Sequence, residues 1–137
     1  MARKSWMRWA AALALLVLLA AIVTACGGGG PVRFENARMT SDKDGDHETD
    51  RYARDDTFYL VVEVKGGGDD VVSTAVWRIT QAMGIQPDYT IGSYSIEGSG
   101  GKVFHAQAPE EGWPVGQYAV DLYLDQVLQD TLEFTVE

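Results

Sequence analysis

The stretch GQYAVDLYL-DQ-VLQDTLEFTV, residues 116–136, places apolar side chains at alternate positions on both sides of a short polar turn. The first apolar row is Tyr118, Val120, Leu122 and Leu124, and the second is Leu128, Leu132, Phe134 and Val136. Because successive side chains of a strand point to opposite faces, a tight turn at Asp125-Gln126 puts both rows on one side of a hairpin. Asp130 falls in the inward register, which predicts a bulge or an exposed strand end there.

The same alternation extends through the chain from residue 32, in short runs separated by Gly, Pro and Asp. Seven strands are predicted: residues 32–39, 57–64, 71–80, 88–94, 102–106, 116–124 and 127–136. No segment of this region has a convincing helical stripe. The pattern predicts an all-β fold, an antiparallel β-sandwich of about seven strands over residues 32–137.

Two groups of residues resemble immunoglobulin-like domains. The motif Trp113-Pro114-x-Gly116-x-Tyr118-x-Val120 resembles the start of strand F, where the hydroxyl of a tyrosine donates a hydrogen bond to the backbone a few residues upstream. Val120 stands where an immunoglobulin has its second cysteine. Trp77 resembles the buried tryptophan of strand C. The ending as a whole is similar to the last hairpin of immunoglobulin-like modules in bacterial surface lipoproteins. The resemblance implies an immunoglobulin-like sandwich, a fold that carries many unrelated functions.

The N-terminus has the composition of an export signal. Basic residues at Arg3, Lys4 and Arg8 precede an apolar run over residues 9–25, and no acidic residue occurs before Glu35. The run ends in Val23-Thr24-Ala25-Cys26, which resembles the lipobox of bacterial lipoproteins. We therefore expect a lipoprotein signal peptide over residues 1–25, with cleavage between Ala25 and Cys26.

Cys26 is the single cysteine of the chain, so it has no partner for an internal disulfide. The resemblance implies that its thiol carries a diacylglycerol and that the freed amine accepts a further acyl chain such as palmitate. Two or three chains anchor a protein almost permanently to a membrane. Residues 26–31 then form a lipidated cysteine and a glycine-rich tether. In bacteria with two membranes, an Asp after the lipidated cysteine usually retains a lipoprotein at the inner membrane, and here that position is Gly27. We therefore expect an anchor in the outer membrane of such a bacterium, or in the cell membrane of a bacterium with one membrane, facing the extracytoplasmic side.

The segment 42–50 carries five acidic residues among its nine. Asp42, Asp44 and Asp46 alternate along it and could offer oxygen ligands to Ca²⁺. The spacing does not match a helical Ca²⁺-binding loop, because Gly45 comes one position early and no late Glu follows. A solvated loop without an ion explains the same composition and is the favoured interpretation. His47 has no second His or Cys nearby, which disfavours Zn²⁺.

Catalytic motifs are absent from the sequence, so we expect no enzymatic activity and no cofactor other than the lipid and, in the alternative, Ca²⁺. No serine lies in a Gly-x-Ser-x-Gly elbow, although a hydrolase built from His105 and a distant serine remains a minor alternative. The sequence after residue 25 has 20 acidic residues and 11 − 3 = 8 basic residues, a net charge of −12, which disfavours nucleic-acid partners.

Aromatic residues supply the remaining candidates for a binding surface, because Tyr and Trp give large contact areas at small entropic cost. Those considered for exposure are Tyr52, Tyr59, Tyr89, Tyr94, Trp113 and Tyr123, with a core position as the favoured alternative. The leading hypothesis is a membrane-anchored, non-enzymatic module that binds an envelope protein or glycan, or serves as an accessory subunit there. The alternatives are a Ca²⁺-stabilised envelope domain and, third, a Ser/His hydrolase.

Overall fold

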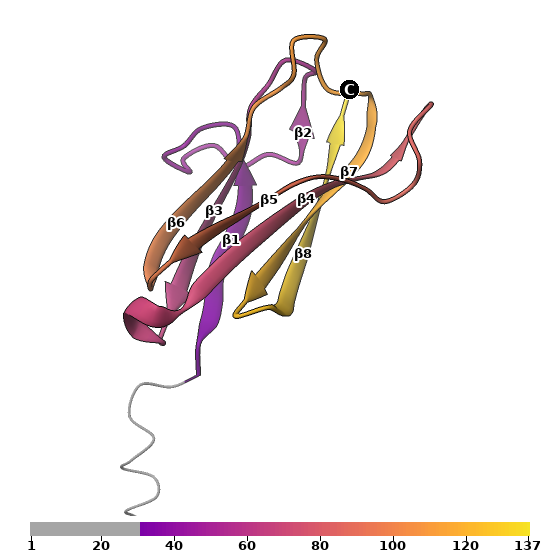
Figure 1. Ribbon diagram of the computed structural model, residues 1–137. Coiled ribbons are helices and arrows are strands. Elements are labelled where there is room, and N and C mark those ends of the chain that lie inside the picture. Colours follow the sequence, from indigo (N-terminus) through magenta and orange to yellow (C-terminus); the bar gives the residue numbers. More distant parts are fainter. Residues whose placement is uncertain (1–30) are drawn as a thin grey trace, which may run out of the picture. The chain divides into compact units, whose positions relative to one another are not determined.

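The computed structural model describes residues 31–137 (Figure 1). Its strands are β1 (Arg33–Thr40), β2 (Arg51–Tyr52), β3 (Phe58–Lys65), β4 (Val72–Ala82), β5 (Tyr89–Glu97), β6 (Gly100–Ala106), β7 (Gly116–Leu124) and β8 (Val127–Val136). A single 3₁₀ turn, η1 (Gly68–Asp70), joins β3 to β4. Within residues 31–137, no helix is long and apolar enough to span a membrane. The predicted signal peptide and Cys26 lie outside the described residues.

The strands form two sheets, of three strands in the order β1-β3-β6 and of five strands in the order β2-β8-β7-β4-β5. The all-β sandwich predicted from the alternating pattern is therefore confirmed. The described region has eight strands and not seven, because the two-residue β2 is too short to show a period. β2 also pairs with β8 in parallel, the one exception to the antiparallel arrangement. β5 ends at Glu97, three residues later than predicted.

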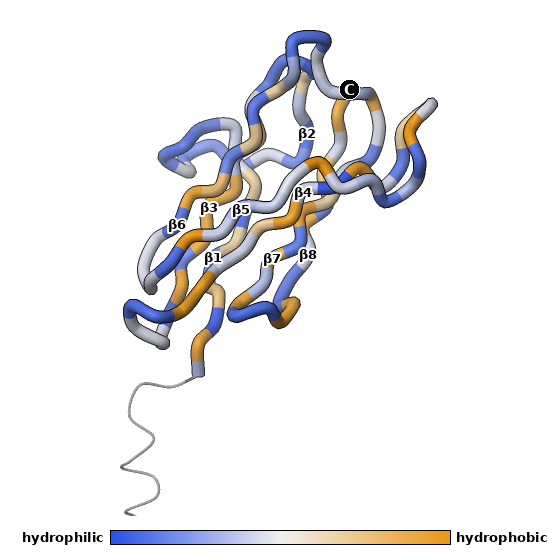
Figure 2. The backbone as a smooth tube through the Cα atoms, in the orientation of Figure 1, coloured by the Kyte–Doolittle hydropathy of each residue, from blue (hydrophilic) through white to orange (hydrophobic). Residues whose placement is uncertain are grey.

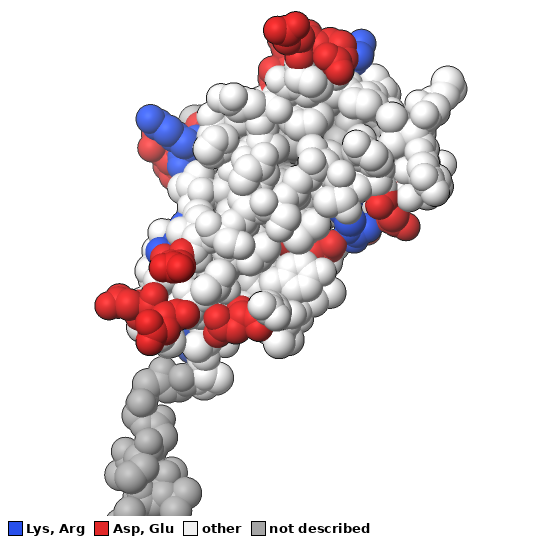
Figure 3. Space-filling view, viewed as in Figure 1, with Lys and Arg blue, Asp and Glu red and all other residues white. Residues whose placement is uncertain are grey.

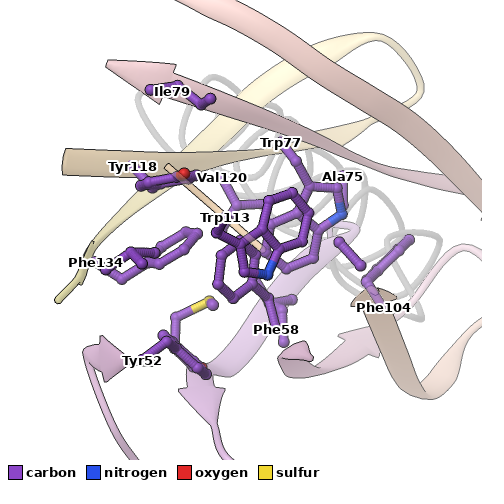
Figure 4. Close-up of a cluster of buried hydrophobic side chains, with 14 of the residues drawn as sticks. Tyr52, Phe58, Ala75, Trp77, Ile79, Phe104, Trp113, Tyr118, Val120 and Phe134 are labelled. Carbon is purple, nitrogen blue, oxygen red and sulfur yellow. The ribbon is translucent and has the colours of Figure 1, made fainter. Parts of the chain in front are cut away.

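The core lies between the sheets and is rich in aromatic side chains (Figure 4). Along β3 and β4 buried residues alternate with half-buried ones, which follows the alternating hydropathy in Figure 2. Phe58 is fully buried at the centre and stacks on Trp113, with ring centroids 4.4 Å apart. Trp77 is fully buried on β4, as the resemblance to strand C implied.

The connection into β7 has the geometry expected from its motif. The Tyr118 hydroxyl donates a hydrogen bond of 2.6 Å to the Pro114 carbonyl, so the predicted tyrosine corner is confirmed. Gly116 pairs with Ala82 at the end of β4, and a Cβ there would collide with the Gln81 carbonyl oxygen. Only glycine allows β7 to begin this close to β4.

The last hairpin forms as predicted, with one correction. The turn residues Asp125 and Gln126 both have positive φ, which matches the right-handed twist of the flanking strands. Leu122 pairs with Asp130 and Tyr123 with Leu128, so one extra residue is accommodated in β8 and the predicted bulge is confirmed. Because the bulge reverses the alternation, Leu128 lies on the outer face and is 53% exposed. Its assignment to the inner row was wrong.

Candidate functional site

A groove opens along one side of the sandwich, where the edge strands of the two sheets face each other. It encloses about 440 Å³. The lining residues come from β5, β6 and the segment after β6: Tyr94, Ser95, Ile96, Val103, Phe104, His105 and Gln107. β5 is the last strand of the five-stranded sheet and β6 is the last strand of the three-stranded sheet. The groove therefore lies between two strands that each have one unpaired edge.

The chain itself creates this groove by changing sheets between β5 and β6. Gly98 has a positive φ, and its amide donates to the Val71 carbonyl, which fixes the end of β5 against the start of β4. After Ser99, β6 continues along β3, with Gly100 opposite Val64. Two consecutive strands thus belong to different sheets, and no further strand among residues 31–137 closes the space between them.

The floor of the groove is apolar, and one wall is aromatic. Phe104 is 2% exposed, and Ile96 packs against the core from β5. Tyr94 is 52% exposed, and its ring lies over Gly92, where a Cβ would stand 3.3 Å from the nearest ring carbon. The missing side chain at Gly92 therefore lets the Tyr94 ring lie along the strand, a contact typical of aromatic residues beside strand glycines.

No Asp, Glu, Lys or Arg lines the groove, in a chain with an excess of acidic residues. Figure 3 shows a largely uncharged central face, with acidic residues at both ends of the molecule and basic and acidic residues together at its sides. At one end, Glu97 pairs with Val72, which is separated by one residue from the turn containing Asp69 and Asp70. This arrangement combines an uncharged floor with an acidic end.

The aromatic candidates divide between core and surface. Tyr89 and Tyr94 are more than half exposed, as considered for a binding surface. Tyr52 and Trp113 are buried at 3% and 4%, the core position that was the favoured alternative, and Tyr59 and Tyr123 are half-buried. The Tyr52 hydroxyl donates to the Thr40 carbonyl, and the Trp113 indole donates to the Asp56 carbonyl. Each polar group is satisfied inside the fold, which allows the rings to be buried.

The acidic segment after β1 forms an ordered loop. Carboxylate oxygens of Asp42, Asp44 and Asp46 lie within 4.8 Å of one another. The Asp42 carboxylate accepts hydrogen bonds from the amides of Asp46 and His47, and it lies 3.6 Å from the His47 imidazole. Gly45 has a positive φ, and its carbonyl accepts from the Arg38 guanidinium. The three predicted ligands are therefore close together in a loop whose Asp42 carboxylate and Gly45 carbonyl already accept hydrogen bonds from within the chain.

The pKa of Asp42 reflects these contacts. Desolvation alone would raise it, but the hydrogen bonds from the His47 and Asp46 amides and the nearby imidazole outweigh that effect, so the pKa is lowered. The carboxylate is consequently ionised over the physiological pH range. An ionised Asp42 is compatible with a cation and equally with the bare loop.

His105 and the serines do not form a catalytic pair within residues 31–137. His105 is exposed on β6 beside Tyr59, on the outer face of the three-stranded sheet. The nearest serine on the groove, Ser95, shares a hydrogen bond of 2.9 Å with Thr74 on the outer face of the other sheet. The two side chains therefore point away from each other. No hydrogen bond joins His105 to a serine or to a carboxylate in the described part of the chain.

Sequence reasoning missed the groove itself, because its members come from two strands of different sheets. It considered Tyr94 and, for another role, His105, but not Ile96, Val103, Phe104 or Gln107 as neighbours of one site. One signal was present in the sequence: the stretch 89–96 has no charged residue although the chain is strongly acidic.

Comparisons with known proteins identify the fold and no family. No family model matches the chain, and no curated protein matches it. Among solved structures, the chain is similar to an immunoglobulin-like protein from Pseudomonas aeruginosa, with a TM-score of 0.55 and 11% identity over 81% of this chain and 100% of that one. The described part of the chain is thus an immunoglobulin-like β-sandwich.

Two enzymes contain a similar sandwich as a part of a longer chain. An alkylpurine DNA glycosylase from Pseudomonas fluorescens matches with a TM-score of 0.51 and 9% identity, over 77% of this chain and 30% of the enzyme. A β-glucosidase from Listeria innocua also matches with a TM-score of 0.51, at 10% identity, over 77% of this chain and 16% of the enzyme. Since the match covers a minor part of each enzyme at low identity, it concerns the fold alone.

Proposed function

We propose that this chain is a lipid-anchored, non-enzymatic, immunoglobulin-like module of the bacterial cell envelope that binds another envelope component through the groove between β5 and β6. The groove is the observation that carries the proposal. It is open, apolar at its floor, lined by no Asp, Glu, Lys or Arg, and walled by an exposed tyrosine. Such a combination is typical of recognition surfaces, in which aromatic side chains supply contact area and neutral polar groups fix orientation.

The anchoring part of the proposal rests on the sequence Val23-Thr24-Ala25-Cys26 and on the glycines that follow it. β1 begins at Arg33, close behind this segment, and Figure 1 places that end of the sandwich opposite the C-terminus at Glu137. A tag fused after Glu137 therefore leaves the N-terminal end of the sandwich free.

The anchor is tested by growing a bacterial host that expresses the chain with an alkyne analogue of palmitate. We expect the wild-type chain to carry the label and to sediment with membranes. Cys26→Ser is expected to lose the label and to retain the uncleaved signal. Labelling of Cys26→Ser at the wild-type level would refute the lipid anchor.

Binding is tested by crosslinking in the intact envelope, with a C-terminal tag and mass identification of what co-purifies. We expect one component at near-stoichiometric yield, and we expect Tyr94→Ala to reduce its recovery more than Tyr89→Ala does. Tyr89 is the matched control because it is equally exposed on the same strand but does not line the groove. Equal recovery with both variants would place the binding surface elsewhere. A serine-directed fluorophosphonate probe that labels the purified chain would contradict the non-enzymatic part.

A second candidate function is Ca²⁺-dependent stabilisation through the loop at 42–46, favoured by the mutual approach of the Asp42, Asp44 and Asp46 oxygens. Ca²⁺ binds six to eight oxygens at 2.3–2.6 Å, so ligands this close to one another suit it. Three protein carboxylates predict millimolar affinity, of the kind found in extracellular modules. Addition of 5 mM CaCl₂ should raise the melting temperature by about 2 °C in the wild type and not in Asp44→Ala. An equal shift in both proteins would refute this candidate.

A further inference from the structure

We infer that the free edge of β5 receives an extended strand of a partner polypeptide, with an uncharged stretch of about six residues and basic residues beyond it. This inference rests on the proposed function and specifies the partner's chemistry. The added strand would pair with the second half of β5 and place alternate side chains in the groove over Ile96 and Phe104. Addition of a strand to an exposed sheet edge is a general mode of peptide recognition.

The first observation is that β5 lacks the usual protection of an edge strand. Exposed edges are normally blocked by lysine, proline, charged side chains or bulges. β5 has no proline and no basic residue, and its only charged residue is Glu97 at the end. Its bulge lies between the pairs at Trp77 and Arg78, near Ile91, so the stretch 92–97 pairs regularly with β4.

The other edges of the two sheets are protected. β1 carries Arg33, Glu35 and Arg38 and has a register shift between Glu35 and Arg38. β2 has only two residues, which is too short to template a partner strand. It covers only the last two residues of β8, and the uncovered part of β8 carries Asp130 and Glu133 and a bulge. β6 carries Lys102 at its centre. Among residues 31–137, the stretch 92–97 of β5 is therefore the longest edge segment without a proline, a basic residue or a bulge, and it also lines the groove.

The second observation is that the groove provides places for side chains next to that edge. The side chains of a strand alternate in direction, so every second residue of an added strand faces inward between the sheets. There it meets Ile96, which packs on the core, and Phe104, which is nearly completely buried. The Tyr94 ring, which lies over Gly92, adds an aromatic contact surface beside this edge.

The third observation is the distribution of charge. Tyr94, Ser95 and Ile96 carry no charge, whereas Glu97 at the strand end lies beside the turn with Asp69 and Asp70. All three acidic side chains are exposed, and none of them forms an ion pair within the described residues. An occupant that is neutral along the groove and basic beyond Glu97 complements this pattern, because opposite charges steer association and fix the register.

The same features favour a polypeptide over the other occupants. A row of unpaired backbone N–H and C=O groups at strand spacing matches another strand and not a sugar ring. A second copy of this chain is a poor occupant, because its own neutral edge ends in Glu97 and would bring further acidic residues to an acidic end.

The test uses the full-length chain in non-ionic detergent and a fluorescent peptide, acetyl-(Lys)₂-(Thr-Val)₃-Thr-(Lys)₂-amide. We expect saturable binding by fluorescence anisotropy, together with slower exchange of the β5 amides that face the free edge. The same peptide with N-methylated valines cannot pair along a strand and should bind at least tenfold more weakly. A version of the peptide with glutamates in place of the lysines should also bind at least tenfold more weakly.

The matched protein variants are Tyr94→Lys and Tyr89→Lys, which add the same charge to the same strand at residues of similar exposure, 52% and 56%. We expect Tyr94→Lys to weaken peptide binding at least tenfold and Tyr89→Lys to change it less than twofold. Thermal melts of both variants establish that each remains folded. Ser95→Lys serves as a second groove variant if Tyr94→Lys does not fold.

Several outcomes overturn the inference. These are no binding of the lysine-flanked peptide at 1 mM, equal binding of the N-methylated peptide, or equal effects of the two tyrosine variants. Perturbation of the same amides by chito-oligosaccharides, without peptide binding, would identify a glycan site instead. An envelope partner whose recovery falls with Tyr94→Ala, but which does not slow exchange of the β5 edge amides, would support the proposed function while overturning this inference. Peptide binding by a chain that acquires no lipid label would support this inference while refuting the anchoring part of the proposed function.

Discussion

Ser73 is fully buried on β4, and its hydroxyl has no hydrogen-bond partner among the described residues. A buried polar group without a partner loses its hydration and gains nothing in return. We expect Ser73→Ala to raise the free energy of unfolding by about 1 kcal/mol, measured by urea denaturation. Ser93→Ala, at an exposed serine on β5, is the control and should change stability by less than about 0.5 kcal/mol. A destabilised Ser73→Ala would mean that the hydroxyl has a partner after all.

Tyr118 is the opposite case, since its buried hydroxyl is paired with the Pro114 carbonyl. Tyr118→Phe should lower the free energy of unfolding by about 1 kcal/mol at pH 7. Burial raises the pKa of Tyr118 to about 12, whereas an unfolded tyrosine ionises near 10. The stabilisation that depends on the protonated Tyr118 hydroxyl is therefore fully present below pH 10 and is lost as the pH rises toward 12. Urea titrations at pH 8 and pH 11 should show a smaller advantage of the wild type at pH 11.

At the scale of elements, the β7–β8 turn carries a backbone strain that substitution can relieve. Asp125 has φ 46° and Gln126 has φ 71°, which lie in the left-handed backbone region that residues other than glycine rarely adopt. Gln126→Gly should increase the free energy of unfolding by about 0.5–1 kcal/mol, measured by chemical denaturation. Gln129→Gly in the neighbouring bulge has no positive φ to relieve and should instead be neutral or destabilising. Stabilisation by both glycines would rule out relief of turn strain.

Three strands are joined on the outer face of the larger sheet by one charged cluster. Arg78 of β4 donates to both oxygens of Asp121 on β7, at 2.6 and 3.1 Å, and Thr131 of β8 donates to the same carboxylate. Burial alone would raise the pKa of Asp121, but the hydrogen bonds from Arg78 and Thr131 lower it. Because the folded pKa lies below the unfolded value of about 3.9, this stabilisation is present above pH 4 and is lost as the pH falls.

Asp121→Asn should therefore cost about 2 kcal/mol at pH 7, since hydrogen bonds to a charged group are replaced by weaker ones. The difference from the wild type should shrink steadily between pH 5 and pH 2, as followed by urea denaturation. Glu133→Gln, at an exposed acid on β8, is the control and should show no comparable change. A pH-independent cost for Asp121→Asn would indicate lost packing and not lost charge.

At the scale of the whole molecule, the net charge of −12 after residue 25 opposes the compact state by self-repulsion. Added salt screens exposed charges, with a Debye length of about 10 Å at 0.1 M. The melting temperature should rise by a few degrees between 20 and 300 mM NaCl, by about the same amount with tetramethylammonium chloride. A rise with Na⁺ alone would point to specific cation binding and not to screening.

The sequence alone predicted the fold where the information is local. Alternation in residues 116–136 predicted the hairpin, and Asp130 marked its bulge, because each depends on neighbouring residues. Trp77 and Tyr118 were assigned from their motif to the core and to the corner, where they lie. The lipobox is also a local pattern, and it remains a prediction.

Only the tertiary structure decided which side chains face the core and which strands form the free edges of the sheets. Leu128 lies outside because the bulge at Gln129 reverses the alternation, and Tyr52 is buried because a short β2 pairs with the distant β8. The groove exists because β5 and β6 end different sheets, so that Tyr94 and Phe104 share one surface. Strand order depends on pairings between residues far apart in the chain, and a period of two along each strand contains no information about its neighbours.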